Sequence, residues 1–442
     1  MSATTGRLAE AAPLPSTRLW ATPARLRECM TCGQFQNVPS LTPGTRADCL
    51  RCGIQIRRGM ADPLGRALAL NLAALAILIV ALTMPLMTVS TAGMTRDATL
   101  LSGPRGMGAS GLWPLEVMVL FTTAVAPAFK LGLMAYVLAG VRLPRPPRHL
   151  RRAYALALHL RAWSMIEVFL IGMAVAYSKL VDLVHLEVGL AVLALFLLMV
   201  TMIAADYVLD RQALWEAMEA RGIPHADIDH AATALSQPGD GAVSCHTCQL
   251  VCLPSQGHEA CPRCGSHLHA RKRNAIARTW ALLIAAAILY IPANYYPVLQ
   301  LIQLGSGAPS TILGGVVELV DAGLLGLAAL VFFASVAVPM MKLAGLITLL
   351  VLTQRRAAGR LRARAQMYYI VEAIGRWSMI DIFMETILVA LVQFGGVVRI
   401  EPGVGAVAFC AVVVLTMFAA ESFDPRLMWD AVGQNHVPEE VA

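Results

Sequence analysis

Eight cysteines stand in four CxxC pairs, and these pairs are grouped two by two along the chain. The first group is Cys29, Cys32, Cys49 and Cys52, and the second is Cys245, Cys248, Cys261 and Cys264. Such spacings are typical of zinc ribbons, in which two knuckles place four thiolates tetrahedrally at about 2.3 Å from the ion. Four sulfur ligands leave no open coordination position. The spacing therefore predicts two structural Zn sites.

Three of the knuckles continue with glycine. Gly33, Gly53 and Gly265 follow the last cysteine of their pairs, where a positive φ lets backbone amides reach the sulfurs. Two alternatives stay open, namely iron in a rubredoxin-like site and pairs of redox-active dithiols. Two cysteines remain outside the pairs: Cys252 could be a spare ligand, and Cys410 fits a small buried apolar residue.

A second set of polar residues lies inside apolar segments. Lys130 and Lys342 stand about ten residues from the nearer Arg-rich loop, or about 15 Å deep at 1.5 Å per residue. An ammonium at that depth needs a partner or a wet cavity. Glu167 and Asp381 lie in the following apolar segments, so we expect a lysine–carboxylate pair in each half of the chain.

The second half carries more polar groups than the first. Ser378, Asp381 and Glu385 fall on one helical face. In the first half, the position that corresponds to Glu385 is occupied by Ile171. We therefore place the functional polar site in the second half, with a carboxylate that can change its protonation state. The competing interpretation is that these groups hold helices together as structural ion pairs.

Composition shows what must position these residues. The chain has 442 residues, of which 57% are hydrophobic and 14% charged, and its mean hydropathy is +0.64. These values are typical of a polytopic membrane protein. Eight segments are long enough to span a bilayer: 67–89, 112–140, 155–178, 187–208, 279–302, 323–352, 367–396 and 403–422.

Arginines crowd the loops between the second and third segments of each half. The positive-inside rule then places both termini, both cysteine groups and both Arg-rich loops in the cytoplasm. Because each half crosses an even number of times, we expect parallel rather than inverted repeats. The net charge of +7 is explained by these flanking residues, and nothing in their pattern indicates nucleic-acid binding.

The chain is an internal duplication. Pro127-x-x-Lys130 corresponds to Pro339-x-x-Lys342, and Trp163-Ser164-Met165 corresponds to Trp377-Ser378-Met379. We expect an all-α polytopic protein with two tandem units, each a zinc ribbon followed by a four-helix bundle. The expected boundaries are a tail at 1–24, ribbon 1 at 25–60, bundle 1 at 65–215, a linker at 216–240, ribbon 2 at 241–270, bundle 2 at 275–430 and a tail at 431–442.

Each proline, three residues before its lysine, should break the helical hydrogen bonding locally. Enzyme signatures are missing from the sequence: it has no P-loop, HExxH or dinucleotide fingerprint. We therefore do not expect an enzyme.

These motifs, together with the terminal Phe423-Asp424-Pro425-Arg426-Leu427-Met428-Trp429, resemble the paraquat-inducible protein A family (PqiA/LetA) over nearly the whole chain. The resemblance implies a subunit of the Gram-negative inner membrane. Its implied partner is a periplasmic MCE-ring protein whose rings form a tunnel for phospholipid, and each bundle would be tetraspanin-like.

Two other functions stay open at this point. One is a membrane oxidoreductase that uses the CxxC dithiols, and the other is a non-transporting scaffold or regulator of the partner. Transport direction, lipid identity, energy source and partner stoichiometry do not follow from the sequence.

Overall fold

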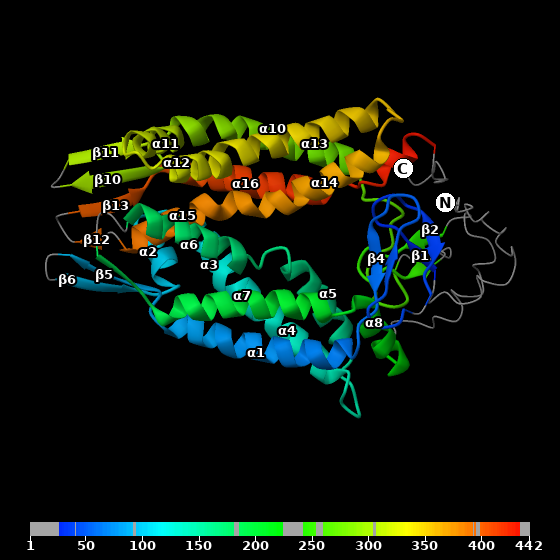
Figure 1. Ribbon diagram of the computed structural model, residues 1–442. Helices are drawn as coiled ribbons and strands as arrows, with labels where there is room; N and C mark the ends of the chain where they lie inside the picture. Colours follow the sequence, from blue (N-terminus) through cyan, green and yellow to red (C-terminus); the bar gives the residue numbers. More distant parts are fainter. Residues whose placement is uncertain are drawn as a thin grey trace, which may run out of the picture.

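The computed structural model describes residues 26–39, 41–91, 94–180, 185–223, 242–252, 260–303, 306–391, 393–394 and 398–433. The described part is elongated, with small sheets at one end and the two cysteine-rich domains at the other (Figure 1). We call these the sheet end and the ribbon end. Helices run along the axis between them.

Six continuous helical segments in this described part are long and apolar enough to cross a membrane. Four are single helices: α1 (Pro63–Thr83), α7 (Leu190–Val208), α10 (Ala275–Tyr295) and α16 (Val404–Ser422). The other two are each interrupted by a π-helical turn: α3 (Trp113–Leu120), η1 (Phe121–Val125) and α4 (Ala126–Gly140) form one, and α12 (Leu325–Phe332), η2 (Phe333–Ala337) and α13 (Val338–Gln354) form the other.

The π-turns end two residues before Pro127 and Pro339. Proline lacks an N–H group, and its ring clashes with the carbonyl four residues earlier, so the backbone widens at this point. The expected local break at each proline is therefore present.

Two expected spans, 155–178 and 367–396, are not continuous helices. The first consists of α5 (Leu150–Leu160) and α6 (Ile166–Leu180), separated by a non-helical turn. The second consists of α14 (Leu361–Gly375), a 3-10 turn η3 (Arg376–Met379) and α15 (Ile380–Leu391). Apolar length alone predicted unbroken helices here, and that prediction was wrong. Eight crossings in two parallel repeats stay a prediction.

The expectation of an all-α protein is confirmed only in part: the described residues are mostly helical, but they also form five small sheets. At the sheet end, β5 (Met87–Thr91) pairs with both β6 (Met94–Ala98) and β7 (His185–Val188). The other sheet there has the order β11-β10-β13-β12. Its strands are β10 (Leu299–Gln303), β11 (Ser306–Ser310), β12 (Gln393–Phe394) and β13 (Val398–Pro402).

Two short helices lie after these hairpins, α2 (Ser102–Ala109) in the first half and α11 (Ile312–Asp321) in the second.

Helix α15 joins the two halves. All twelve of its residues are buried, and it packs against both α6 and α2 of the first half (Figure 1). A Cβ on Gly172 of α6 would lie 3.0 Å from the Ile380 carbonyl oxygen, and one on Gly103 of α2 would lie 2.5 Å from Thr386 Cγ2. Glycine at these two positions therefore allows the close approach of α15.

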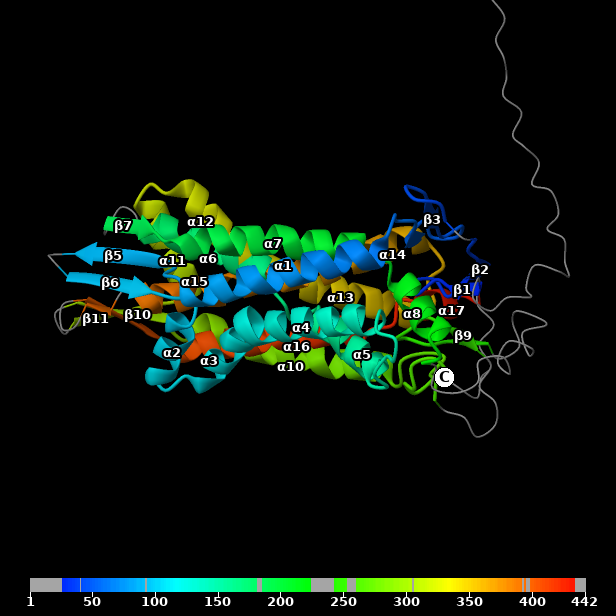
Figure 2. The ribbon, with the colours of Figure 1, turned by 90° about the horizontal axis from the view of Figure 1, so that it is seen from below.

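The ribbon end is built from hairpins that are too short to have a core of their own. Ribbon 1 contains β1 (Leu26–Glu28), β2 (Phe35–Asn37), β3 (Arg46–Asp48) and β4 (Gln55–Arg58). Ribbon 2 contains β8 (Val243–Ser244), β9 (Val251–Cys252) and an isolated bridge between Ala260 and His267. Two further helices, α8 (Arg211–Ala220) and α17 (Leu427–Asp430), also lie at the ribbon end (Figure 2).

Candidate functional site

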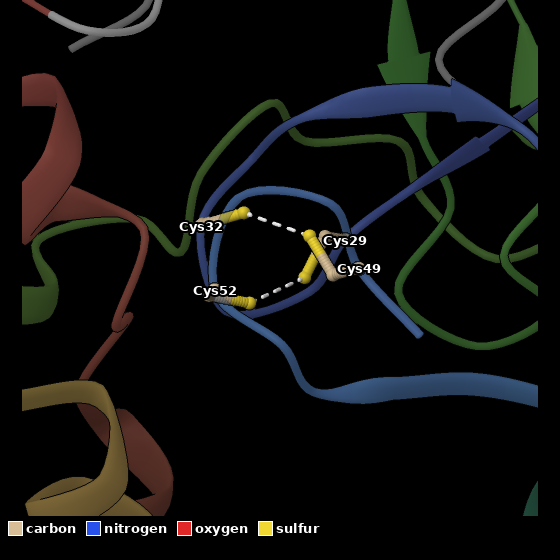
Figure 3. A group of neighbouring side chains, drawn as sticks. All are labelled: Cys29, Cys32, Cys49 and Cys52. Atoms are coloured by element: carbon tan, nitrogen blue, oxygen red, sulfur yellow. Dashed lines mark hydrogen bonds between the residues drawn. The ribbon is translucent and has the colours of Figure 1, made fainter. Parts of the chain in front are cut away.

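Ribbon 1 brings its four cysteines together as the spacing predicted. The sulfurs of Cys29 and Cys52 are 3.5 Å apart, as are those of Cys32 and Cys49, and the four converge between two turns of the chain (Figure 3). All four are buried. In a regular tetrahedron with metal–sulfur bonds of about 2.3 Å, the sulfurs are about 3.8 Å apart. The cluster therefore fits a tetrahedral metal ion.

Ribbon 2 repeats this geometry. Distances of 3.5 Å separate the sulfurs of Cys245 and Cys264 and those of Cys248 and Cys261. Cys252 lies outside this group on β9, where its sulfur is 3.7 Å from the Val243 carbonyl oxygen. None of the ten cysteines forms a disulfide. Both clusters could hold a metal ion.

The knuckle turns show why glycine follows the cysteine pairs. Gly33, Gly53 and Gly265 have φ values of 72°, 78° and 78°, and each donates its backbone N–H to the carbonyl of the first cysteine of its pair. The fourth knuckle has Gln249 in this position with φ 59°. The expected positive φ at the three glycines is confirmed, and the fourth knuckle adopts the same turn without glycine.

Each ribbon packs against the bundle of the other half. The cysteines of ribbon 1 share a core with α13 and α17, including Leu349 and Trp429. Those of ribbon 2 share a core with α4 and α8, including Leu138 and Trp215. The two ribbons also meet each other through Leu26 and Val251. This crosswise docking ties the halves together at the ribbon end.

A buried ion network fixes ribbon 1 on the second half. Arg426, 1% exposed, donates to Asp424 at 2.9 Å and to Glu28 of β1 at 3.1 Å. Glu28 also accepts from Arg271 at 3.2 Å. Burial alone would raise the pKa of Asp424, but the Arg426 guanidinium lowers it to about 2. Asp424 is therefore charged at neutral pH.

The predicted pair of the first half is not formed. Lys130 donates instead to Asp206 of α7 at 2.9 Å, and Asp206 also accepts from Arg161 at 3.1 Å. Glu167 accepts from Arg376 of the second half at 3.1 Å. The sequence analysis missed Asp206, although a carboxylate inside an apolar segment was the signal that could have identified it.

The second half differs from the first at this position. Lys342 is 1% exposed, and its Nζ has no hydrogen-bond partner within the described residues. The expected pair with Asp381 or Glu385 is therefore absent. A Cβ on Gly375 would lie 2.9 Å from Lys342 Nζ, so the ammonium lies against the backbone where α14 ends.

The other polar groups predicted for this half are also buried. Ser378, Asp381 and Glu385 are 2%, 5% and 4% exposed, and Ser335 of η2 lies beside the Asp381 carboxylate. Ser378 Oγ, Asp381 Oδ2 and Glu385 Oε2 have no hydrogen-bond partner in the described part of the chain. Burying a polar atom without a hydrogen-bond partner costs free energy. The presence of these three groups therefore suggests a function rather than a contribution to stability.

The architecture defines a multi-pass membrane protein with two four-cysteine clusters and a buried polar group inside its second half. A family model described as "Paraquat-inducible protein A" matches the chain twice, over residues 64–219 and 276–433. The chain belongs to this family.

Several relatives match along almost the whole chain. "Intermembrane transport protein PqiA" of Escherichia coli K12 is 34% identical over 91% of this chain and 95% of its own length. "Lipophilic envelope-spanning tunnel protein A" of the same organism is 30% identical over 92% and 91%. "Probable intermembrane transport protein" of Haemophilus influenzae is 27% identical over 94% and 98%. No solved structure matches this chain. The names of these relatives, two given as transport proteins and one as a tunnel protein, support a membrane transport role, and none of the three names is that of an enzyme.

Proposed function

We propose that this protein is the integral inner-membrane subunit of an MCE-type lipid transport system in a Gram-negative bacterium. It would move phospholipid between the inner membrane and the tunnel of a periplasmic MCE-ring protein. The family membership and the transport names of the relatives support this proposal. Eight crossings would place the termini and ribbons in the cytoplasm and the sheet end in the periplasm, where the partner would be met.

The observation that carries the proposal is the buried polar group of the second half. Lys342, Ser378, Asp381 and Glu385 each have a polar atom without a partner in the described residues. Ionisable residues inside membrane segments usually belong to substrate or proton pathways. In this site Lys342 would attract the phosphate of a headgroup, and protonation of Asp381 or Glu385 would control access.

Both cysteine clusters would hold Zn as structural sites. Four thiolates close the coordination sphere, so the metal would brace the crosswise contacts of the ribbons rather than take part in transport. Lys130 and Glu167 would contribute through their ion pairs, which hold helices of the first half and link the halves.

The experiment is lipid transfer between liposomes containing this protein and the MCE-ring partner. Asp381→Asn should abolish transfer while zinc content, thermal stability and partner binding stay unchanged. Asp48→Asn is a matched control, because Asp48 is an exposed carboxylate that pairs with Arg46 within ribbon 1.

Unchanged transfer in the Asp381→Asn variant would contradict the assigned role of the polar site. Thiols that titrate reversibly without metal would instead favour the oxidoreductase. Normal partner binding without any transfer by the wild type would favour a scaffold or regulator.

A further inference from the structure

One ion pair joins the two halves between their broken helices. Glu167 lies in the first turn of α6, and Arg376 begins the 3-10 turn η3. Arg376 Nη1 donates to Glu167 Oε1 at 3.1 Å, and the side chains are 39% and 34% exposed. The pair is therefore partly accessible from outside the protein.

Its depth follows from the helices around it. Helix α15 has 12 residues, or about 18 Å at 1.5 Å per residue, and it separates η3 from the sheet end. The hydrocarbon core of a bilayer is about 30 Å thick. Arg376 thus lies near the middle of that core, where an uncovered charged side chain is costly unless it meets a polar ligand or water.

An apolar groove of about 590 Å³ is lined by Glu167 of this pair and by Trp377, the residue that follows Arg376 in the chain. Ile171 and Val175 of α6 also line it, together with Phe196 of α7 and Leu330 of α12. The α6 residues of the groove extend to Ser178, which is about 16 Å along the helix. That length is about one leaflet of the hydrocarbon core, and the volume is typical of ligand pockets.

Arg376 has N–H donors that Glu167 does not use. Glu167 occupies Nη1, and the guanidinium makes no other hydrogen bond with the described residues. The planar guanidinium can therefore donate from Nε and Nη2 to a second acceptor, and phosphate oxygens fit such a two-point contact. Glu167 orients the guanidinium and stays paired while this happens, so binding does not leave a lone carboxylate.

We propose that this groove is a phospholipid subsite, in which an acyl chain lies along α6 and Arg376 binds the headgroup phosphate. The inference rests on the proposed function, since it assigns the transported lipid a binding site between the halves of the protein. Arg376 is the specificity-determining residue, and Glu167 is a positioning residue. The required ligand has one phosphate and at least one long apolar chain.

The test uses the full-length, zinc-loaded protein in lipid nanodiscs. A photoreactive residue replaces Ile171 in the groove and, as a control, Ile288 on α10, which is 61% exposed and does not line the groove. The probes are radiolabelled phosphatidylglycerol and a diacylglycerol with the same chains but no phosphate.

Arg376→Gln should lower phosphatidylglycerol labelling at position 171 by about tenfold or more, the effect of about 1.4 kcal/mol, and leave diacylglycerol labelling and position 288 unchanged. Arg376→Lys should restore part of the labelling. Arg161→Gln is the matched control, because Arg161 belongs to a comparable ion pair with Asp206 at 3.1 Å outside the groove.

Equal labelling by both probes, or no loss in Arg376→Gln, would overturn the subsite. Suppression by millimolar inorganic phosphate would also overturn it, because the site would then bind the free anion. Lipid transfer is measured in parallel. If the wild type transfers lipid but its labelling does not depend on Arg376, only the subsite is contradicted. If labelling depends on Arg376 but no lipid is transferred, the proposed function is contradicted and the groove is a lipid-binding site without a role in transfer.

Discussion

Replacing Lys342 by methionine should stabilise the folded protein while abolishing lipid transfer. The Lys342 ammonium is 1% exposed and makes no hydrogen bond with the described residues. An unsatisfied buried donor costs about 1–3 kcal/mol, and lysine at the centre of a membrane helix costs about 2.5–3.5 kcal/mol. Methionine has a similar length and no charge, so we expect a gain of about 2 kcal/mol.

The assay is thermal unfolding of the zinc-loaded protein in one detergent, followed by tryptophan fluorescence. For units of roughly 150–250 residues, 1 kcal/mol shifts Tm by about 2–4 °C, so the Lys342→Met variant should melt about 4–8 °C higher than the wild type. Lipid transfer is measured on the same preparation. A gain in stability together with lost transfer is the signature of a group kept for its function.

The first half provides a control at the corresponding position. Lys130 donates to Asp206 at 2.9 Å, so Lys130→Met leaves this carboxylate with Arg161 alone and should lower Tm. The two lysines occupy equivalent positions in the sequence, yet the expected shifts have opposite signs. If Lys342→Met lowered Tm as Lys130→Met does, Lys342 would be a structural residue and the reasoning would fail.

Two further predictions concern the ribbon end. Cys49→Ser leaves three sulfur ligands in ribbon 1, so plasma emission spectrometry should find zinc falling from about two ions per chain to about one; two ions, or none, would show that the clusters are not independent structural sites. Asp424 has its pKa lowered from 3.8 to about 2, mainly by Arg426 against the effect of burial. It should therefore contribute about 2 kcal/mol of stability at neutral pH, a contribution that is lost as pH falls from about 4 to about 2. The difference in unfolding free energy between wild type and Asp424→Asn should thus shrink over this range, and a difference independent of pH would contradict the assignment.

The sequence by itself determined the features that depend on local chemistry. Cysteine spacing located both four-cysteine clusters that could hold a metal ion, because a knuckle is closed by a few consecutive residues. Pro127 and Pro339 located the two π-turns, because proline disturbs its own helix. Apolar length found the six long helical segments.

Only the tertiary structure decided which groups meet. Lys130 pairs with Asp206 across 76 residues of sequence, and Glu167 pairs with Arg376 across 209. Such partners depend on the rotation and spacing of helices, which hydropathy does not encode. The crosswise docking of the ribbons was hidden for the same reason, because their small hairpins complete their cores on surfaces supplied by the opposite half. Lys342 was left without its expected partner because the end of α14 places it against Gly375. That position is fixed by how the helices pack and not by the residues next to Lys342 in the chain.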